Sequence, residues 1–342
     1  MLPNVKLTNT LSGQKEEFSP REPGKVSMYA CGLTPQDAPH IGHIRGAVVM
    51  DIIRRWFEVL GFEVNFVQNF TDIDDKIINR MKQEGITAIE VADKYAAIYE
   101  EALNSLNIKP IQFVRVTTNM QDIINMVASL IDKGCAYAVD GDVYYSVTKF
   151  KDYGKLSKRN PADLISGSRI EVDERKKDPL DFALWKSAKP GEPSWESPWG
   201  LGRPGWHIEC STLSLKYLGN NFDIHAGGTD LIFPHHENEI AQSEAYLGGA
   251  DFCRYWLHWG AITAGGEKMS KSVGNDAKVN AILAKYSPEA IRLYLLGTSY
   301  RSPIDYGLDR LDEAQAGWGR VQRAVSNAQR WLEDKTEVCD RS

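Results

Sequence analysis

The sequence predicts an α/β protein built on a doubly wound parallel sheet, because apolar strand patterns alternate with amphipathic helical patterns. Lys25–Cys31 (KVSMYAC) is expected to form a buried strand, His43–Leu60 a helix, and Glu63–Phe70 (EVNFVQNF) a second strand. A strand, a helix and a strand on this scale form a βαβ unit with parallel strands. Ligands of such sheets bind beyond the carboxyl ends of the strands, which here are Cys31 and Thr71.

The first helix is predicted from apolar residues at four-residue spacing, and Gly61 is expected to end it. A long helical stretch follows from about Asp74 to Leu106. The aspartates at its start suggest either Mg²⁺ binding or N-capping, and we favour the cap because carboxylates stabilise helix N-termini. The apolar row is Ile44, Val48, Ile52, Trp56 and Leu60, and the aspartates are Asp72, Asp74 and Asp75.

The pattern changes between Ile111 and Pro204, where a hairpin-like YAVDGDVYYSV and a Pro/Trp/Gly-rich segment predict an insertion within the sheet. Buried strands resume at Phe222–Ala226 and Trp256–Thr263, with a helix over Ile232–Leu247 between them. Two further helices are expected at Pro288–Leu296 and Leu308–Leu332.

Composition excludes several protein classes. The 342 residues carry a net charge of −6, which argues against general nucleic-acid coating and leaves any RNA contact to a local surface. No run approaches the ~20 apolar residues of a membrane helix, and no signal peptide pattern opens the chain. The five cysteines are scattered, so a disulfide framework is disfavoured and we expect a cytoplasmic protein.

The strongest local motif is His40-Ile41-Gly42-His43 at the start of the first helix. His40 and His43 can donate hydrogen bonds to phosphate oxygens, and Gly42 lets a flat adenine approach the backbone. The helix N-terminus adds a field that favours anions. These features predict an ATP site, although a single histidine at a helix start is also an ordinary cap.

A second motif, Lys268-Met269-Ser270-Lys271-Ser272, lies in a glycine-flanked loop. Lys268 and Lys271 can stabilise charge that builds on leaving pyrophosphate. HIGH followed by KMSKS on a βαβ scaffold resembles the signature of class I aminoacyl-tRNA synthetases. This resemblance implies a Rossmann-type catalytic domain.

A third group has the ligand types that zinc prefers, namely two thiols, one imidazole and one carboxylate. His235 and Glu239 are four residues apart and share one helix face, whereas Cys31 and Cys210 are distant in sequence. Buried cysteines are often only small apolar residues. From chemistry alone, both the metal site and the plain core remain open. Asp230, after a Gly-Gly-Thr turn, is a candidate for a substrate ammonium or a ribose hydroxyl.

Longer motifs make the chain resemble the cysteinyl-tRNA synthetase family over about residues 4–306: MYACG, NFTDIDDKI, GRPGWHIECS, FDIHAGGTDLIFPHHENEIAQSEA, KMSKSVGN and YRSPIDY. The resemblance implies one Zn²⁺ per chain, bound by Cys31, Cys210, His235 and Glu239 and contacting the substrate thiolate. It also implies that Thr71, Trp206 and His225 surround the cysteine. Lys271 is then expected to contact ATP, which serves as substrate together with Mg²⁺.

The resemblance also divides the chain. We expect residues 1–110 and 205–263 to form the two halves of the catalytic domain, 111–204 an inserted connective domain for the acceptor end, 264–307 the KMSKS loop and stem-contact region, and 308–342 the start of a helical bundle. Members of this family continue into an anticodon-binding domain, which we expect to be missing here. The expected state is a monomer.

Two functions fit these residues. The first is ATP-dependent activation of L-cysteine to cysteinyl-adenylate, followed by transfer to the 3′ end of tRNA(Cys). The alternative is a stand-alone ligase that transfers the activated cysteine to a small amine such as an amino sugar, as in the mycothiol-pathway cysteine ligase. Glu239 and the segment Tyr300–Pro303 favour the first. A non-enzymatic regulator is disfavoured, because the catalytic candidates are all present.

Overall fold

A computed structural model of the chain describes residues 5–160, 174–264, 267–268 and 277–339. The chain divides into two compact units. The first consists of Met1–Ala38, Ile52–Tyr99 and Pro110–Trp259, and the second of Pro39–Asp51, Glu100–Lys109 and Gly260–Ser342.

The strands are β1 (Lys6–Asn9), β2 (Gln14–Glu17), β3 (Lys25–Leu33), β4 (Glu63–Phe70), β5 (Gln112–Arg115), β6 (Ala136–Val139), β7 (Asp142–Tyr145), β8 (Phe182–Ser187), β9 (Gly202–Pro204), β10 (Phe222–Gly228), β11 (Cys253–Trp259), β12 (Ile262–Ala264), β13 (Glu267–Lys268) and β14 (Ile304–Asp305). The α-helices are α1 (Ile41–Val59), α2 (Asp75–Glu84), α3 (Ala88–Ser105), α4 (Met120–Asp132), α6 (Trp206–Leu218), α7 (Glu237–Tyr246), α8 (Val279–Leu283), α9 (Pro288–Leu296) and α10 (Leu308–Cys339). Short helical turns are η1 (Thr117–Asn119), η2 (Val147–Lys149), η3 (Thr229–Leu231) and η4 (Ile232–His236).

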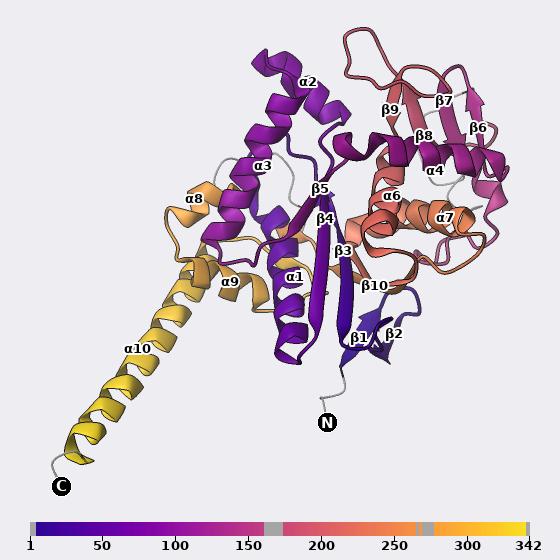
Figure 1. The fold of residues 1–342 in the computed structure, drawn as a ribbon. Helices are drawn as coiled ribbons and strands as arrows, with labels where there is room; N and C mark the ends of the chain where they lie inside the picture. Colours follow the sequence, from indigo (N-terminus) through magenta and orange to yellow (C-terminus); the bar gives the residue numbers. More distant parts are fainter. Residues whose placement is uncertain (1–4, 161–173, 265–266, 269–276, 340–342) are drawn as a thin grey trace. The chain divides into compact units, whose positions relative to one another are not determined.

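The first unit contains a five-stranded parallel sheet in the order β11-β10-β3-β4-β5. This confirms the predicted doubly wound sheet. Figure 1 labels β10, β3, β4 and β5 of this sheet. Met28, Tyr29 and Ala30 of β3 have no exposed surface, because β3 is a central strand and α6 packs on it. The chain continues from β3 to β4 on one side, whereas β10 lies on the other. The gap between the carboxyl ends of β3 and β10 is therefore the topological switch point, where such sheets bind ligands.

The stretch predicted as one helix from Asp74 to Leu106 is two helices, α2 and α3. Gly85 ends α2 in the left-handed conformation, with a φ of 68°. Thr87 and Glu90 then start α3 as a capping box, in which Thr87 N donates to Glu90 Oε2 at 2.7 Å and Glu90 N donates to Thr87 Oγ1 at 3.2 Å. The prediction was wrong because helical periodicity alone did not take account of these stop and start signals.

The three aspartates at the start of α2 have separate structural partners. Asp74 is the N-cap of α2 and accepts a hydrogen bond from Lys76 N at 2.8 Å, which confirms the predicted cap. Asp72 is buried and accepts hydrogen bonds from Thr117. Asp75 forms an ion pair with Arg203. Asp74 and Asp75 thus support the helix and its packing.

The region expected to be inserted holds a separate antiparallel sheet in the order β6-β7-β8-β9. The predicted hairpin is β6–β7, and its turn residues Asp140 and Gly141 both have positive φ angles, as a tight two-residue hairpin turn requires. The structure differs at the start of this region. There β5, which lies within the predicted insertion, extends the central sheet parallel to β4.

The predicted strand Trp256–Thr263 is two strands in two sheets. Its first half belongs to β11 of the central sheet, and its second half belongs to β12 of a small sheet in the second unit. Gly260 separates them, and a Cβ there would lie 2.4 Å from the backbone of Ser302. The small sheet has the order β13-β12-β14. The predicted helix Pro288–Leu296 is found as α9 with the same bounds.

The apolar row predicted for the first helix is only partly buried. Ile44 and Val48 have no exposed surface, but Ile52 is 39% and Trp56 54% exposed. Four residues turn an α-helix by about 400°, so a strict four-residue row drifts by about 40° at each step. The row therefore leaves the buried face at Ile52 and Trp56, whereas Leu60, directly after the helix, is buried again. Across the described residues, we find no helix with the length and apolar character needed to traverse a bilayer.

Candidate functional site

Four buried side chains converge at the switch point of the central sheet. Cys31 comes from β3, Cys210 from α6, His235 from η4 and Glu239 from α7, and none is more than 7% exposed. Their ligand atoms all lie within 4.8 Å of one another. Cys31 Sγ lies 3.4 Å and His235 Nε2 3.0 Å from Glu239 Oε1. The structure thus brings together the four residues that the sequence predicts as metal ligands, which we call the donor cluster.

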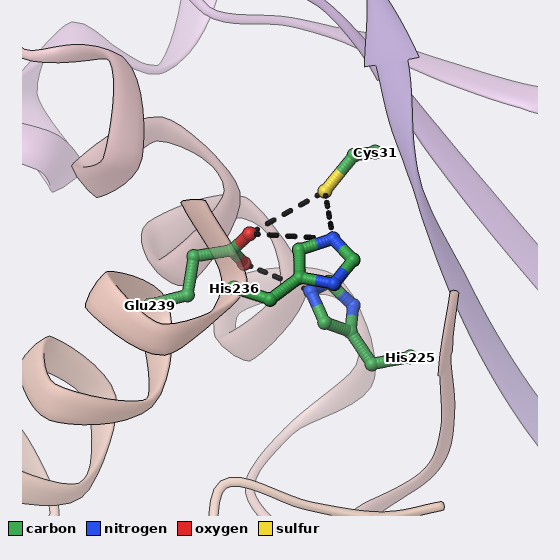
Figure 2. A group of neighbouring side chains, drawn as sticks. All are labelled: Cys31, His225, His236 and Glu239. Atoms are coloured by element: carbon green, nitrogen blue, oxygen red, sulfur yellow. Dashed lines mark hydrogen bonds and ion pairs between the residues drawn. The ribbon is translucent and has the colours of Figure 1, made fainter. Parts of the chain in front are cut away.

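Two further histidines lie against the donor cluster (Figure 2). His225 Nε2 lies 2.9 Å from Glu239 Oε2, and His236 Nε2 lies 3.2 Å from Cys31 Sγ. Cys31, His225, His236 and Glu239 therefore form a second set whose ligand atoms lie within 4.8 Å of one another. The two sets share Cys31 and Glu239, so this is one polar centre with six side chains.

Charge is distributed unevenly within the cluster. Burial opposes ionisation of Glu239, but the imidazoles of His225 and His235 hold its pKa well below its ordinary value. Burial lowers the pKa of His235, but Glu239 and Cys210 raise it to about 10. Burial raises the pKa of Cys31 well above its ordinary value. Although burial also opposes ionisation of Cys210, hydrogen bonds with Cys31 and His235 lower its pKa to about 6. The cluster therefore contains anionic donors at neutral pH.

Outer partners fix the orientation of the cluster imidazoles. His207 Nδ1 lies 2.9 Å from His235 Nδ1, which leaves His235 Nε2 directed at Glu239. Burial and the nearby His235 lower the pKa of His207 well below its ordinary value, so its ring is neutral. On the other side, His258 Nε2 lies 2.7 Å from His236 Nδ1. Such partners fix ring orientation and tautomer in metal centres.

Thr71 lies at the end of β4, and other protein groups already contact its hydroxyl. Its Oγ1 donates to Glu209 Oε2 at 2.8 Å and accepts from Asn69 Nδ2 at 3.2 Å. Asn69 Oδ1 also accepts a hydrogen bond from Gly32 N at 2.8 Å and lies 3.5 Å from Cys210 Sγ. Asn69 thus connects β3, β4 and α6 beside the donor cluster.

The other predicted substrate residues differ in exposure. Trp206 begins α6 and is 44% exposed, and its ring centroid lies 4.2 Å from that of His235. It therefore presents an aromatic surface next to the donor cluster. Asp230 lies in η3 directly after β10 and is exposed.

The predicted ATP residues lie in the second unit. The rings of His40 and His43 stack with centroids 3.8 Å apart at the N-terminus of α1. Gly42 N donates to His40 Nδ1 at 3.1 Å, and a Cβ on Gly42 would lie 2.9 Å from that ring. Lys268 ends β13, whereas Lys271 lies outside the described residues.

Sequence reasoning missed five polar residues around the cluster, namely Asn69, His207, Glu209, His236 and His258. His207 and Glu209 flank predicted residues in WHIEC, and His236 follows His235 directly, so proximity to the motifs could have identified these three. Asn69 opens the motif NFTDIDDKI two residues before Thr71, so the same proximity could have identified it. His258 offered no local signal, because its contact depends on the packing of distant segments.

Comparisons with known proteins identify the family of this chain. A family described as tRNA synthetases class I (C) catalytic domain matches residues 17–316. The cysteine–tRNA ligase of Carboxydothermus hydrogenoformans is 58% identical over 324 residues, covering 94% of this chain and 70% of the relative. That of Aquifex aeolicus is 51% identical, covering 95% and 66%. This chain spans about two thirds of their length.

Among solved structures, a similar fold is found in methionyl-tRNA synthetase of Mycobacterium tuberculosis in complex with methionyl-adenylate. The TM-score is 0.67, with 84% of this chain and 67% of that chain covered. The sequences are 17% identical, so this likeness concerns the fold alone.

Proposed function

This chain belongs to the cysteine–tRNA ligase family of class I tRNA synthetases, and we propose that it activates L-cysteine with ATP and transfers it to the 3′ end of tRNA(Cys). The observation that carries the proposal is the donor cluster. A buried group of two thiols, one imidazole and one carboxylate at the switch point suits a metal that selects a thiol substrate.

We propose that Cys31, Cys210, His235 and Glu239 hold one zinc ion. The ligand types are those that zinc prefers, and the four ligand atoms all lie within 4.8 Å of one another. When bound, zinc supplies a soft Lewis acid that prefers a thiolate sulfur to a hydroxyl oxygen. Both cysteines are free thiols in the structure, which supports a reducing, cytoplasmic location.

This arrangement addresses a selection problem. Serine differs from cysteine by one atom, and an ordinary pocket separates such near-isosteres by only ~1–3 kcal/mol. Trp206 offers a flat apolar wall beside His235, which suits a small side chain. The Thr71 hydroxyl is already hydrogen-bonded to Glu209 and Asn69, so its role is to shape the wall of the cysteine site. His225 Nε2 lies 2.9 Å from Glu239 Oε2 and holds that carboxylate in place.

For the activation step, we propose that ATP lies over Gly42 with its phosphates at His40 and His43. The helix N-terminus and both imidazoles favour the phosphate charge. The substrate carboxylate is already ionised, so attack on the α-phosphorus needs no general base from the protein. Lys268, Lys271 and Mg²⁺ then stabilise charge on pyrophosphate, and catalysis depends on positioning and electrostatics.

Cysteine-dependent ATP–pyrophosphate exchange by zinc-loaded protein tests the proposal, with serine as the control and total tRNA as the acceptor. We expect exchange with cysteine alone, followed by charging of tRNA. Exchange without charging would overturn the transfer step and favour a ligase with a small-amine acceptor. No exchange would overturn the activation step.

A further inference from the structure

Arg45 is a buried cation on the helix that begins at the HIGH motif. It lies two residues after His43 and is 1% exposed. Its Nη2 donates to the carbonyl oxygens of Ser302 at 2.5 Å and Tyr300 at 3.2 Å. Within the described part of the chain, Nε and Nη1 have no hydrogen-bond partner. Burying a cation without a carboxylate is unfavourable, so the two carbonyl contacts are its main stabilising interaction in the structure.

These two carbonyls belong to the segment that leads into β14. Tyr300 O also accepts a hydrogen bond from Gly260 N at 2.9 Å, and Ile304 N donates to Ala261 O at 3.1 Å. The same segment is therefore held both by Arg45 and by the residues that enter β12. The absence of a Cβ at Gly260 lets this backbone approach that of Ser302 closely.

The small sheet carries this connection to Lys268. β14 pairs in parallel with β12, and β12 pairs antiparallel with β13. In the second pairing Thr263 lies opposite Lys268. The backbone of Lys268 is thus two strands away from the segment that Arg45 holds, and both belong to the second unit.

A second connection joins the HIGH segment to the chain beyond the KMSKS motif. His40 forms an isolated antiparallel bridge with Lys278, and Val279 N donates to Pro39 O at 3.0 Å. The residues around His40 therefore contact the backbone after this motif directly, while Arg45 contacts the segment that leads into β14.

We propose that Arg45 is a positioning residue of the ATP site, which sets β14, β12 and β13, and with them the backbone of Lys268, relative to the helix of His40 and His43. This inference rests on the proposed function. A guanidinium suits the task because its nitrogens have fixed directions and one of them meets two carbonyls here. A lysine ammonium has the charge without this fixed geometry.

The test compares Arg45→Met, Arg45→Lys and the matched control Arg54→Met in cysteine-dependent ATP–pyrophosphate exchange. Arg54 lies on the same helix, and its Nη1 also donates to a carbonyl, that of Pro110, at 2.6 Å. For Arg45→Met we expect kcat/KM for ATP to fall about 10–100-fold, as for other lost positioning contacts, while zinc content and KM for cysteine stay within about twofold. Arg45→Lys is expected to lie between wild type and Arg45→Met, and Arg54→Met to match wild type.

Wild-type kinetics for ATP in Arg45→Met would overturn the proposal. The proposal would also be overturned if kcat/KM for ATP and for cysteine fell equally, in proportion to the fall in melting temperature, because that result indicates general destabilisation. If Arg45→Met unfolds, Arg45→Lys decides, since it keeps the buried charge and changes the geometry. If wild type shows no exchange, the proposed function fails. Calorimetric binding of ATP to wild type and Arg45→Lys still tests the role of Arg45, and equal affinities would overturn it.

Discussion

The donor cluster and the His40–His43 motif are both rich in histidine, but the chain builds them in different ways. Cys31 and Glu239 are 208 residues apart and meet only when β3 and α7 pack. His40 and His43 are three residues apart, and one helix start places them together. All four donor residues are buried, whereas His43 is exposed. The first site depends on the tertiary fold, and the second on local structure.

This difference separates two kinds of sensitivity. In the donor cluster each side chain stabilises the charge state of another, so loss of one donor leaves buried groups without partners. At the exposed helix start, water can replace a lost imidazole in the resting protein. We therefore expect changes in the cluster to alter metal content and stability together, and changes in the motif to alter catalysis alone.

The largest effect is expected from Cys210→Ser. Serine is a poor zinc ligand, and even outer-shell changes lower metal affinity or activity about 10–100-fold, so loss of a ligand should lower exchange activity by more than about 100-fold. Zinc measured by mass spectrometry should fall well below one ion per chain, and the melting temperature should fall with it. Cys253→Ser is the matched control, because Cys253 is also a buried thiol but lies outside both ligand sets. Full zinc occupancy in Cys210→Ser would contradict the ligand assignment.

The next effect is expected from His43→Asn. Loss of one phosphate-binding donor should lower kcat for exchange by about 10²-fold, a typical loss when one preorganised donor to developing charge is removed. Zinc content and the melting temperature should match wild type, because His43 is exposed at a helix start. A fall in the zinc content of this variant would show that the His40–His43 motif also supports the donor cluster, and would contradict the separation of the two sites.

The same contrast explains what the sequence predicted. β4 and α9 have their predicted bounds, because Gly61 before β4 and Ser287-Pro288 before α9 are local signals. The four donors could be named from motifs, but the orientation of His235 by His207 and the bond between Thr71 and Glu209 require segments that pack only in three dimensions. Charge and tautomer in the cluster follow from those contacts, so sequence alone could not supply them.

A smaller effect is expected from Trp206→Ala. Trp206 is the proposed apolar wall for the cysteine side chain beside His235, and lost burial of one CH₂ group costs about 0.8 kcal/mol, so KM for cysteine should rise about 2–10-fold. Zinc should stay bound, because all four donors remain. Trp206→Phe keeps a flat ring and should restore most of the affinity. Loss of zinc from Trp206→Ala would place the tryptophan in the support of the metal site instead of the substrate wall.

The smallest effect is expected from Thr87→Ala, which changes a local structure in the unit that holds the donor cluster. Thr87 and Glu90 exchange hydrogen bonds at the start of α3, and loss of a threonine cap lowers the free energy of unfolding by about 1 kcal/mol. Thr87→Ser keeps the hydroxyl and should restore this loss in equilibrium urea unfolding. Zinc content and exchange kinetics should be unchanged in both variants. If Thr87→Ala released zinc, metal binding would depend on small changes in the stability of the first unit. The contacts among the donor-cluster side chains would then be insufficient to maintain the site.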